Sequence, residues 1–551
     1  MDDREFKHRM NSIHISIVGK PDLFYLKNIS SSGFVDVEQF LYAKGYYTST
    51  LNSSSRPPVS PVVELLVKRS NGTLTAAEAD AQINALRAYD VRNDFNRYMY
   101  QNAVSRQHAI SMNGGSSNTA WNFAAGLDQN IGSLNEHYSR ITLRSANTFR
   151  LSRFIELSAA LDITQSLAVA GRSGYNTVST ANGKLPPYTR LADDAGNPVA
   201  VIKDYRQAYI DTAGAGKLFD WNYYPLTDDK EVNSRASLSS AQASAGLNIK
   251  LLKGLTADLK YRYQRQSVSS PALYSAQSYY TRNLVNRYSQ LNRATGVVTY
   301  KLPPGAILIS GNDMMQSHSG RAQLNYTLRN RIINVNAIAG AEIREVDNTG
   351  NDFTTYGLNT DNLSSGAVDY VNAYPNFISG STSYISNGID FSHTVNRFVS
   401  LYGNAAATFW NRYTLSASAR KDASNLFGIH SNEKWTPLWS AGLAWNISRE
   451  KFYRSGKVPY LNLRLSYGVS GNADPDRSAV TTIFFEGNNP FVPVAIPTSR
   501  VEQFANPGLR WEKVYMLNVG FDFSSKNDRI GGSLEYYHKK QPTFLQPARS
   551  I

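Results

Sequence analysis

Apolar and polar residues alternate with a period of two in about fourteen segments of this chain, each about ten residues long. In one clear segment Ile155, Leu157 and Leu161 alternate with Glu156 and Asp162. Successive side chains of a strand point to opposite faces, so each segment predicts a strand with one apolar and one polar face. Equivalent segments start near Ala109, Trp121, Ile141, Ala241, Leu255, Ala322, Ile333, Val399, Tyr413, Leu438, Leu461, Leu517 and Ile530.

The connections between these segments alternate between short turns and long loops. Short turns lie at 114–118, 148–153, 250–254, 329–331, 410–412 and 524–528, and long connections cover 165–234, 266–316, 346–394, 428–436 and 473–511. Outer-membrane barrels combine short periplasmic turns, long extracellular loops and strands of about ten residues. Sandwich strands are shorter, and propeller blades repeat at a fixed period. The pattern therefore predicts an all-β, transmembrane antiparallel β-barrel.

The chain before the first of these strands carries helical signals. Thr75 and Glu78 form a capping-box pattern, and Ile83, Leu86 and Tyr89 recur at helical spacing toward residue 100. A shorter helix is expected over 62–67. We expect residues 21–104 to form a helical segment on the extracellular rim that precedes the first complete strand.

Residues 1–20 do not have the pattern of a signal peptide. The apolar stretch at 13–18 is interrupted by His14 and Ser16, and no small-residue cleavage site follows it. We expect an unrecognised leader here. The order of turns requires a strand running toward the outside before the segment near Ala109, but no part of 1–104 is convincing as that strand.

Composition and charge fit the barrel without proving it. The 34 Tyr and 23 Phe can supply interfacial aromatic girdles, and cysteine is absent, as suits passage through an oxidising periplasm. The sequence contains no run of about 18 apolar residues, so it predicts no membrane-spanning helix. The net charge of +14 comes from scattered Lys and Arg without a basic block, so contact with lipopolysaccharide or anionic solutes is expected rather than nucleic-acid binding.

No arrangement of residues predicts catalysis, a metal site or a cofactor. Residues 211–217 lack the spacing of a phosphate-binding loop, and the clusters of Asp and Asn at 347–352 and 472–476 fit solvated turns better than calcium loops. Aromatic and polar residues in two long loops are the candidate ligand contacts, because aromatic faces beside carboxylates suit sugars. Loop packing or contact with a partner protein would explain them equally: Asp220, Trp221, Tyr223, Tyr224, Tyr279 and Tyr280.

Several segments resemble, in the same order, the SusC/RagA branch of TonB-dependent transporters from Bacteroidetes. They run over nearly the whole chain after residue 20. The segments are FVDVEQFLYAKGYY at 34–47, SRPPVSPVVELL at 55–66, YDVRNDFNRYMYQNAVSRQHAISMNGGSSNTAWNFAAGLDQN at 89–130, ARKDASNLFG at 419–428, WTPLWSAGLAWNISREKF at 435–452, LRLSYGVSGNAD at 463–474 and ANPGLRWEKVYMLNVGFDF at 505–523.

The resemblance implies an outer-membrane barrel of about 22 strands that encloses a plug. It also implies energy supplied by the TonB–ExbB–ExbD complex through a TonB box, and a SusD-like surface lipoprotein as partner. About fourteen of the implied strands are recognisable. The plug, the TonB box and the first strand are not recognisable in the sequence. The last segment breaks into an irregular tail at 541–551, so we expect a chain truncated at both ends.

From this we expect residues 105–540 to be barrel strands with long extracellular loops. The expected function is the barrel portion of an importer of oligosaccharides or other large nutrients such as peptides. It is not expected to be an enzyme or to need a cofactor. A surface-binding barrel that transports nothing, or a non-functional gene remnant, is the alternative.

Overall fold

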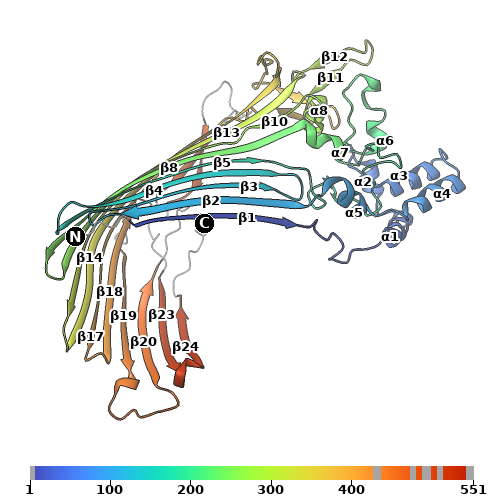
Figure 1. Ribbon diagram of the computed structural model, residues 1–551. Coiled ribbons are helices and arrows are strands. Elements are labelled where there is room, and N and C mark those ends of the chain that lie inside the picture. Colours follow the sequence, from blue (N-terminus) through green and yellow to red (C-terminus); the bar gives the residue numbers. More distant parts are fainter. Residues whose placement is uncertain (1–5, 426–435, 472–479, 487–497, 506–512, 542–551) are drawn as a thin grey trace.

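The computed structural model describes residues 6–425, 436–471, 480–486, 498–505 and 513–541. One antiparallel sheet of 16 strands dominates it, and each strand pairs with its neighbours in chain order (Figure 1). Strands β9 and β10 share one position between β8 and β13, on either side of Ser270 and Pro271. Proline has no N–H for the ladder, which accounts for the break.

The predicted strand segments all form strands of this sheet. Their bounds are β2 (Ala103–Gly115), β3 (Thr119–Ile131), β4 (His137–Arg150), β5 (Ile155–Val169), β8 (Val232–Leu252), β9 (Leu255–Ser269), β13 (Ala306–Arg329), β14 (Ile333–Leu358), β17 (Asp390–Phe409), β18 (Tyr413–Ser424), β19 (Thr436–Asn446), β20 (Tyr460–Ser470), β23 (Val514–Ser524) and β24 (Gly531–Lys540). The short strand β10 (Ala272–Tyr274) completes the β9 position.

Strand β1 (Phe6–Val18) lies where we expected an unrecognised leader and no strand, and that expectation is wrong. All 13 of its residues pair with β2 in antiparallel register. Ile13, Ile15 and Ile17 are exposed on one face, and His14 and Ser16 alternate with them. The polar residues that interrupt the apolar stretch at 13–18 are therefore the alternation of a strand, and β1 is the strand that the order of turns requires.

The two faces of the sheet differ as the alternation predicts. We call the face that carries Leu161 and Ile163 the outer face, and the face that carries Asp162 and Thr164 the inner face. Leu161 and Ile163 are 44% and 40% exposed, whereas their inner-face neighbours are half-buried. Directly paired residues share a face, so the register extends the apolar outer face from strand to strand, as Leu247 opposite Leu259 illustrates.

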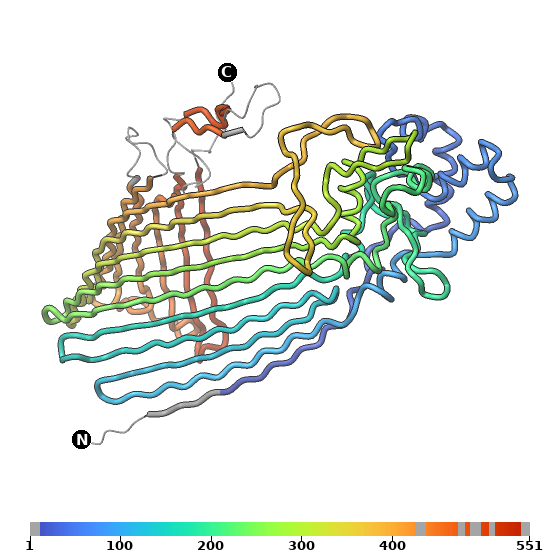
Figure 2. The backbone as a smooth tube through the Cα atoms, turned by 90° about the horizontal axis from the view of Figure 1, so that it is seen from above, coloured from blue at the N-terminus to red at the C-terminus, as the bar shows by residue number. Residues whose placement is uncertain are grey.

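Short turns and long loops gather at opposite ends of the strands (Figure 2). The loop bounds differ from the expected ones, because strands continue into the predicted loops. Loop 170–231 replaces 165–234, loop 270–305 replaces 266–316, and loop 359–389 replaces 346–394. At these strand ends the residues still pair with the neighbouring strand and point alternately to the two faces. Their outer face is no longer apolar, so the hydropathy pattern did not predict the strand there. The connections at 428–436 and 473–511 lie largely outside the described residues; within the second, β21 (Thr482–Glu486) and β22 (Thr498–Gln503) pair as a hairpin.

Strands β13 and β14 reach furthest, with 24 and 26 residues. Toward the loop end the outer face of β14 and of its neighbour β17 becomes charged. Glu345 of β14 pairs with Arg397 of β17 at 2.5 Å, and Asp347 lies 3.0 Å from His393. Carboxylates and guanidinium groups are costly in hydrocarbon, so this part of the sheet stands outside the lipid. The cluster at 347–352 thus lies in a strand and not in a turn.

Helices follow β1 and cover the loop end of the sheet. They are α1 (Ser31–Ala43), α2 (Thr48–Asn52), α3 (Pro61–Ser70), α4 (Ala76–Leu86), α5 (Val91–Asp94) and the π-helix Phe95–Met99. The predicted capping box is confirmed: Thr75 accepts from the Glu78 N–H, and the Glu78 carboxylate accepts from the Thr75 N–H at 2.9 Å. Pro61 at the first turn and Ser60 as N-cap fix the start of α3.

The buried core lies in this helical and loop region. One cluster joins Val35, Val62 and Ile83 of the helices to Tyr188 of loop 170–231. A second cluster joins Val91, Phe95 and Met99 to residues of the same loop and of loop 270–305. We call the helical segment 31–99 and the loops 170–231, 270–305 and 359–389 together the cap. Its hydrophobic cores make it a folded unit at the end of the sheet.

Candidate functional site

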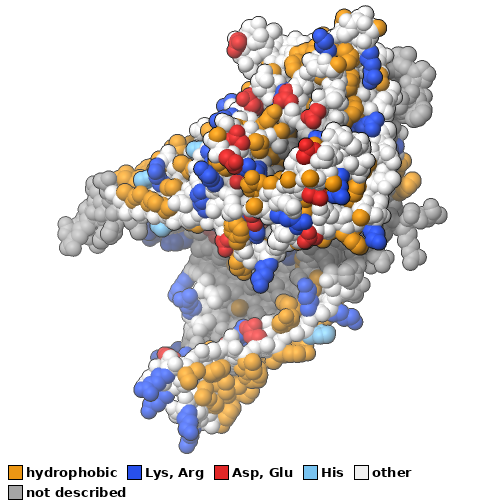
Figure 3. All heavy atoms as spheres, turned by 90° about the vertical axis from the view of Figure 1, so that its right-hand side faces the viewer, with side chains coloured by type: hydrophobic (Ala, Val, Ile, Leu, Met, Phe, Trp, Pro, Cys, Tyr) orange, Lys and Arg blue, Asp and Glu red, His pale blue; other side chains and the backbone are white. Residues whose placement is uncertain are grey.

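The inner face of the sheet and the cap at its end are the two surfaces that carry charge and aromatic groups in quantity. Viewed from the cap, acidic and basic side chains intermingle over the upper part of the molecule (Figure 3). The lower arm of the sheet carries a broad apolar area. An apolar area of this kind is expected where a sheet faces lipid, and mixed charges are expected where the protein faces water.

Ion pairs link neighbouring strands across the inner face. Arg140 of β4 lies 2.7 Å from Asp128 of β3, and Arg144 pairs with Asp162 of β5. Arg464 of β20 bridges to Asp522 of β23 at 2.8 Å. Each pair joins residues that lie on the same face according to the register. The inner face is therefore a polar surface on which ion pairs connect neighbouring strands.

Two loops of the cap are joined through Arg282 of α8 (Tyr279–Arg287). Its buried guanidinium donates to the backbone carbonyls of Asp220, Asn222 and Gln277, the last two at 3.1 and 2.8 Å. The Asp220 carboxylate lies 3.5 Å away. Because these carbonyls have their partner in the guanidinium, Arg282 fixes the position of 220–222 against α8.

Three of the six predicted ligand contacts lie in the interior of the cap. Trp221, Tyr223 and Tyr279 are 4%, 6% and 6% exposed and pack in one core cluster. The Trp221 Nε1–H donates to Asn283 at 3.0 Å, and the Tyr279 hydroxyl donates to Asp204 at 2.9 Å. The polar atoms of Trp221 and Tyr279 thus have protein partners, and all three side chains are buried, so for these three the structure favours the loop-packing interpretation over ligand contact.

The other three candidates remain accessible on the cap surface. The Asp220 side chain is 50% exposed, Tyr280 is 40% exposed and Tyr224 is half-buried. Partial burial, followed by the nearby Asp220 charge, raises the pKa of the Tyr224 hydroxyl. Tyr280 packs against Tyr274 with ring centroids 4.4 Å apart and the two rings tilted by 38°. Ligand contact by Asp220, Tyr224 and Tyr280 stays a prediction.

A buried carboxylate that the sequence analysis did not single out joins the helices to loop 170–231. Glu38 of α1 is 4% exposed, and its Oε2 accepts from the Tyr188 hydroxyl at 2.6 Å. Burial raises the pKa of the Glu38 carboxyl, although hydrogen bonds from Ser60 and Tyr188 oppose the shift. The sequence signal was its spacing of three from Val35 on the buried face of α1.

Acidic groups at the end of loop 170–231 are also partly desolvated. Burial raises the pKa of Asp228 and of Asp229. Asp228 accepts from the Tyr279 N–H at 2.5 Å, and Asp229 accepts from the Ser173 N–H. Both carboxylates thus hold backbone of the cap. In the described part of the chain, no three His, Cys, Asp or Glu side chains converge as metal ligands.

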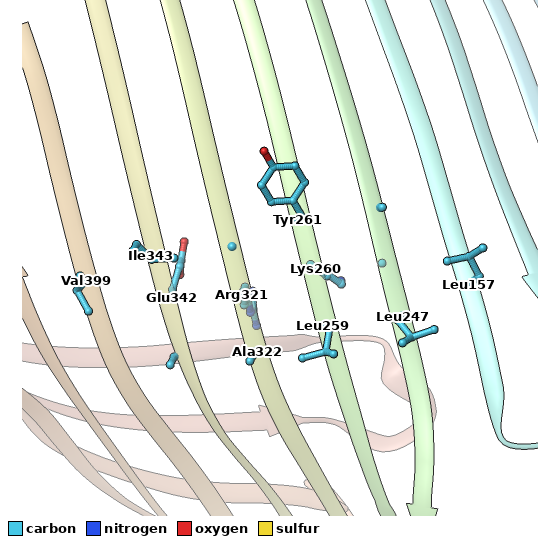
Figure 4. A pocket seen from close by; sticks show the side chains of 14 residues that line it. Leu157, Leu247, Leu259, Lys260, Tyr261, Arg321, Ala322, Glu342, Ile343 and Val399 are labelled. Carbon is cyan, nitrogen blue, oxygen red and sulfur yellow. The ribbon is translucent and has the colours of Figure 1, made fainter.

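One hollow of the sheet surface opens on the outer face. Leu157, Leu247, Leu259 and Tyr261 line it, together with Ile343 (Figure 4). Lys260, Arg321 and Glu342 also contribute to its lining. Most of its walls are apolar side chains of the lipid-facing register, so it accommodates acyl chains better than a polar ligand. Among the helices of the described residues, none has both the length and the hydropathy of a membrane span.

The second half of the chain matches a described protein family. Residues 274–550, just over half of the 551 residues, match "TonB dependent receptor-like, beta-barrel". The TonB-dependent receptor SusC of Bacteroides thetaiotaomicron is 32% identical over 162 residues, which are 28% of this chain and 16% of SusC. The TonB-dependent receptor P39 of Formosa agariphila is 30% identical over 185 residues, 32% of this chain and 17% of P39.

Solved structures give the same fold over nearly the full chain. The structure of the RagAB peptide transporter superposes with a TM-score of 0.69 at 16% identity, covering 98% of this chain and 54% of the other. The "closed-closed" state of the RagAB peptide importer gives a TM-score of 0.68 at 15% identity, over 98% of this chain and 55% of the other. The chain therefore spans about half the length of these structural relatives.

Proposed function

The chain belongs to the TonB-dependent receptor β-barrel family. From this premise we propose that it forms part of the barrel wall and the extracellular cap of an outer-membrane importer of oligosaccharides or other large nutrients. Membership of this family implies an outer-membrane location and the role of a receptor, not of an enzyme. The observation that carries the proposal is the two-faced sheet. One side is apolar for lipid, the other is a polar wall for hydrated cargo, and a folded cap stands at the end of the strands.

The proposed partners follow from the relatives. We propose that a SusD-like surface lipoprotein docks on the cap and that the TonB–ExbB–ExbD complex energises transport. The chain is similar to SusC in sequence and to a peptide transporter in fold, so oligosaccharides and peptides are both candidate cargo. On the cap, Asp220, Tyr224 and Tyr280 are the proposed first contacts, because they combine accessible aromatic faces with a carboxylate.

Uptake by the native bacterium tests transport. The gene that encodes this chain is deleted, and accumulation of fluorescent oligosaccharides and peptides in the periplasm is measured, with the intact gene restored as control. We expect loss of uptake for one cargo class and recovery on complementation. A strain that lacks TonB should show the same loss.

Binding to the cell surface separates transport from the alternative. A barrel that only binds would retain cargo on the cell surface without periplasmic accumulation, and deletion of TonB would change nothing. That result would overturn the import proposal. Unchanged binding and uptake after deletion would indicate a non-functional remnant.

A further inference from the structure

The connections at the end of the sheet opposite to the cap share a local pattern. They cover 116–118, 151–154, 253–254, 330–332, 410–412, 447–459 and 525–530. In or directly beside five of them, a cation and a large apolar residue are adjacent in the sequence. We call these five pairs the turn-end surface: Arg153–Phe154, Leu252–Lys253, Arg331–Ile332, Lys451–Phe452 and Arg529–Ile530.

Both members of each pair are exposed. The apolar side chains are between 49% and 73% exposed, and the five cations are exposed as well. Single exposed apolar residues are ordinary on a protein surface. Their repetition beside a cation in five separate turns is a pattern, and it indicates a surface that meets an apolar and an anionic medium at the same level.

The positive charge of the turn-end surface has little compensation. The carboxylates of these connections are Glu450 and Asp528. Glu450 accepts from the Tyr413 hydroxyl at 2.5 Å and from the Trp445 Nε1–H at 3.1 Å, and it lies 3.2 Å from Arg412. Among the described residues, no carboxylate lies within 4.0 Å of a cation of the turn-end surface. Further exposed cations lie in the last two connections: Arg449, Arg454, Lys457 and Lys526.

The turn-end surface adjoins the lipid-facing outer face. Leu252 pairs with Leu255 at the end of the outer-face register. The Arg153 guanidinium lies 4.6 Å from the ring centroid of Phe154, so here the cation and the ring stand together. At the lower end of the sheet in Figure 3, Lys and Arg side chains border the broad apolar area. The cations therefore lie where the apolar face ends, at the level of lipid headgroups on the short-turn side of an outer-membrane barrel.

We propose that the turn-end surface binds anionic phospholipids of the periplasmic leaflet. The apolar member of each pair enters the outermost part of the acyl-chain layer, and its neighbouring cation stays at the headgroup level and binds a phosphate. A phospholipid fits better than a periplasmic protein, because each cation adjoins an exposed apolar side chain at the border of the lipid-facing face. The inference rests on the outer-membrane placement in the proposed function, and it adds a lipid partner at the end of the molecule opposite to the cap.

Quenching of tryptophan fluorescence by brominated lipids tests this binding, with the purified chain in detergent micelles. Trp410, which is 58% exposed in connection 410–412, is a reporter at this end of the sheet. Brominated phosphatidylglycerol is the anionic probe, and brominated phosphatidylcholine is the zwitterionic probe. The unaltered chain should bind the anionic lipid about fivefold more tightly, as expected when about one cation acts on one net charge near a membrane surface. High salt should reduce this preference.

Three variants give the comparison. Replacement of all five cations of the turn-end surface by Gln should abolish the preference for the anionic lipid. The triple variant Arg153→Lys/Arg331→Lys/Arg529→Lys keeps the charge and should retain the preference. The matched control removes the same charge from exposed positions of the cap and should also retain it: Lys44→Gln, Lys68→Gln, Lys184→Gln, Lys217→Gln and Lys230→Gln together.

Equal affinity of the unaltered chain for the two lipids would overturn the proposal and would favour a periplasmic protein or the cell wall at this surface. A preference that survives the removal of all five cations, or that the cap variant loses equally, would overturn it too. Because lipid binding is measured without uptake, a chain that binds the anionic lipid but imports no cargo would contradict the import function and leave this surface assigned.

Discussion

At the scale of single residues, the hydrogen bond between Tyr188 and Glu38 ties the helical segment to loop 170–231. The variant Tyr188→Phe leaves the buried Glu38 carboxylate without that partner, so we expect the cap to lose about 1–3 kcal/mol of stability. Limited proteolysis of segment 31–99 measures the loss. Tyr25→Phe is the control, because Tyr25 is 83% exposed. Equal cleavage of the two variants would contradict the expectation.

The same carboxyl makes the stability of the cap depend on pH. Burial raises the pKa of Glu38 above its ordinary 4.5, so the folded cap binds this proton more tightly than the unfolded chain does. The contribution is fully present below the ordinary pKa and is lost as pH rises through the folded pKa. We expect Glu38→Gln to reduce this loss of stability with rising pH, as measured by thermal unfolding at several pH values. An unchanged slope would mean that other groups cause it.

The contacts of Arg282 predict a graded response to two substitutions. Arg282→Gln removes donors from two carbonyls of loop 170–231, so segment 205–225 should become more accessible to protease, at a cost of about 1–3 kcal/mol. Asp220→Asn removes only a half-exposed ion pair and should change little. A larger effect of Asp220→Asn would reverse this assignment.

At the scale of elements, the pairing of β1 with β2 can be tested by cross-linking, because the chain contains no cysteine. Ser16 lies opposite Ser105. Paired Cα atoms in antiparallel strands are about 4.5–5.5 Å apart, within the range of a disulfide. The variant Ser16→Cys/Ser105→Cys should form a disulfide on mild oxidation, detected by gel mobility. The offset pair Ser16→Cys/Gln107→Cys should react much less, and the reverse order would show a shifted register.

The strands could be predicted from the sequence because alternation is a local property. Leu161 and Asp162 reveal their faces without any knowledge of neighbouring strands. Strand β1 was missed because its clear alternation covers only 13–18, too short to stand out beside charged residues.

The candidate site was harder to predict, because burial in the cap depends on contacts between distant segments. Tyr279 and Tyr280 are adjacent in the sequence, yet the first is 6% exposed and the second 40%. Periodicity therefore predicted the wall of the barrel, and the sequence could not separate packing aromatics from accessible ones.

At the scale of the whole molecule, the assignment of outer and inner faces predicts different effects of the same new residue at adjacent positions. Leu161→Arg places a cation on the lipid-facing side of β5 and should cost up to about 2–4 kcal/mol in the membrane. Ala160→Arg places it on the polar inner face and should be tolerated. Heat-resistant migration of the membrane-extracted protein on gels measures the difference, and equal loss for both variants would contradict the assignment.

The length of β13 and β14 determines how far the protein stands above the cell. A strand of 26 residues at about 3.3 Å per residue is about 85 Å long, and a tilt of about 45° leaves a rise of about 60 Å. The hydrocarbon layer takes up only about 30 Å of this height. The charged pairs Glu345–Arg397 and Asp347–His393 lie in the remainder. In the outer membrane, where the proposed function places the protein, the cap would therefore be accessible to antibodies and bacteriophages that never cross the membrane.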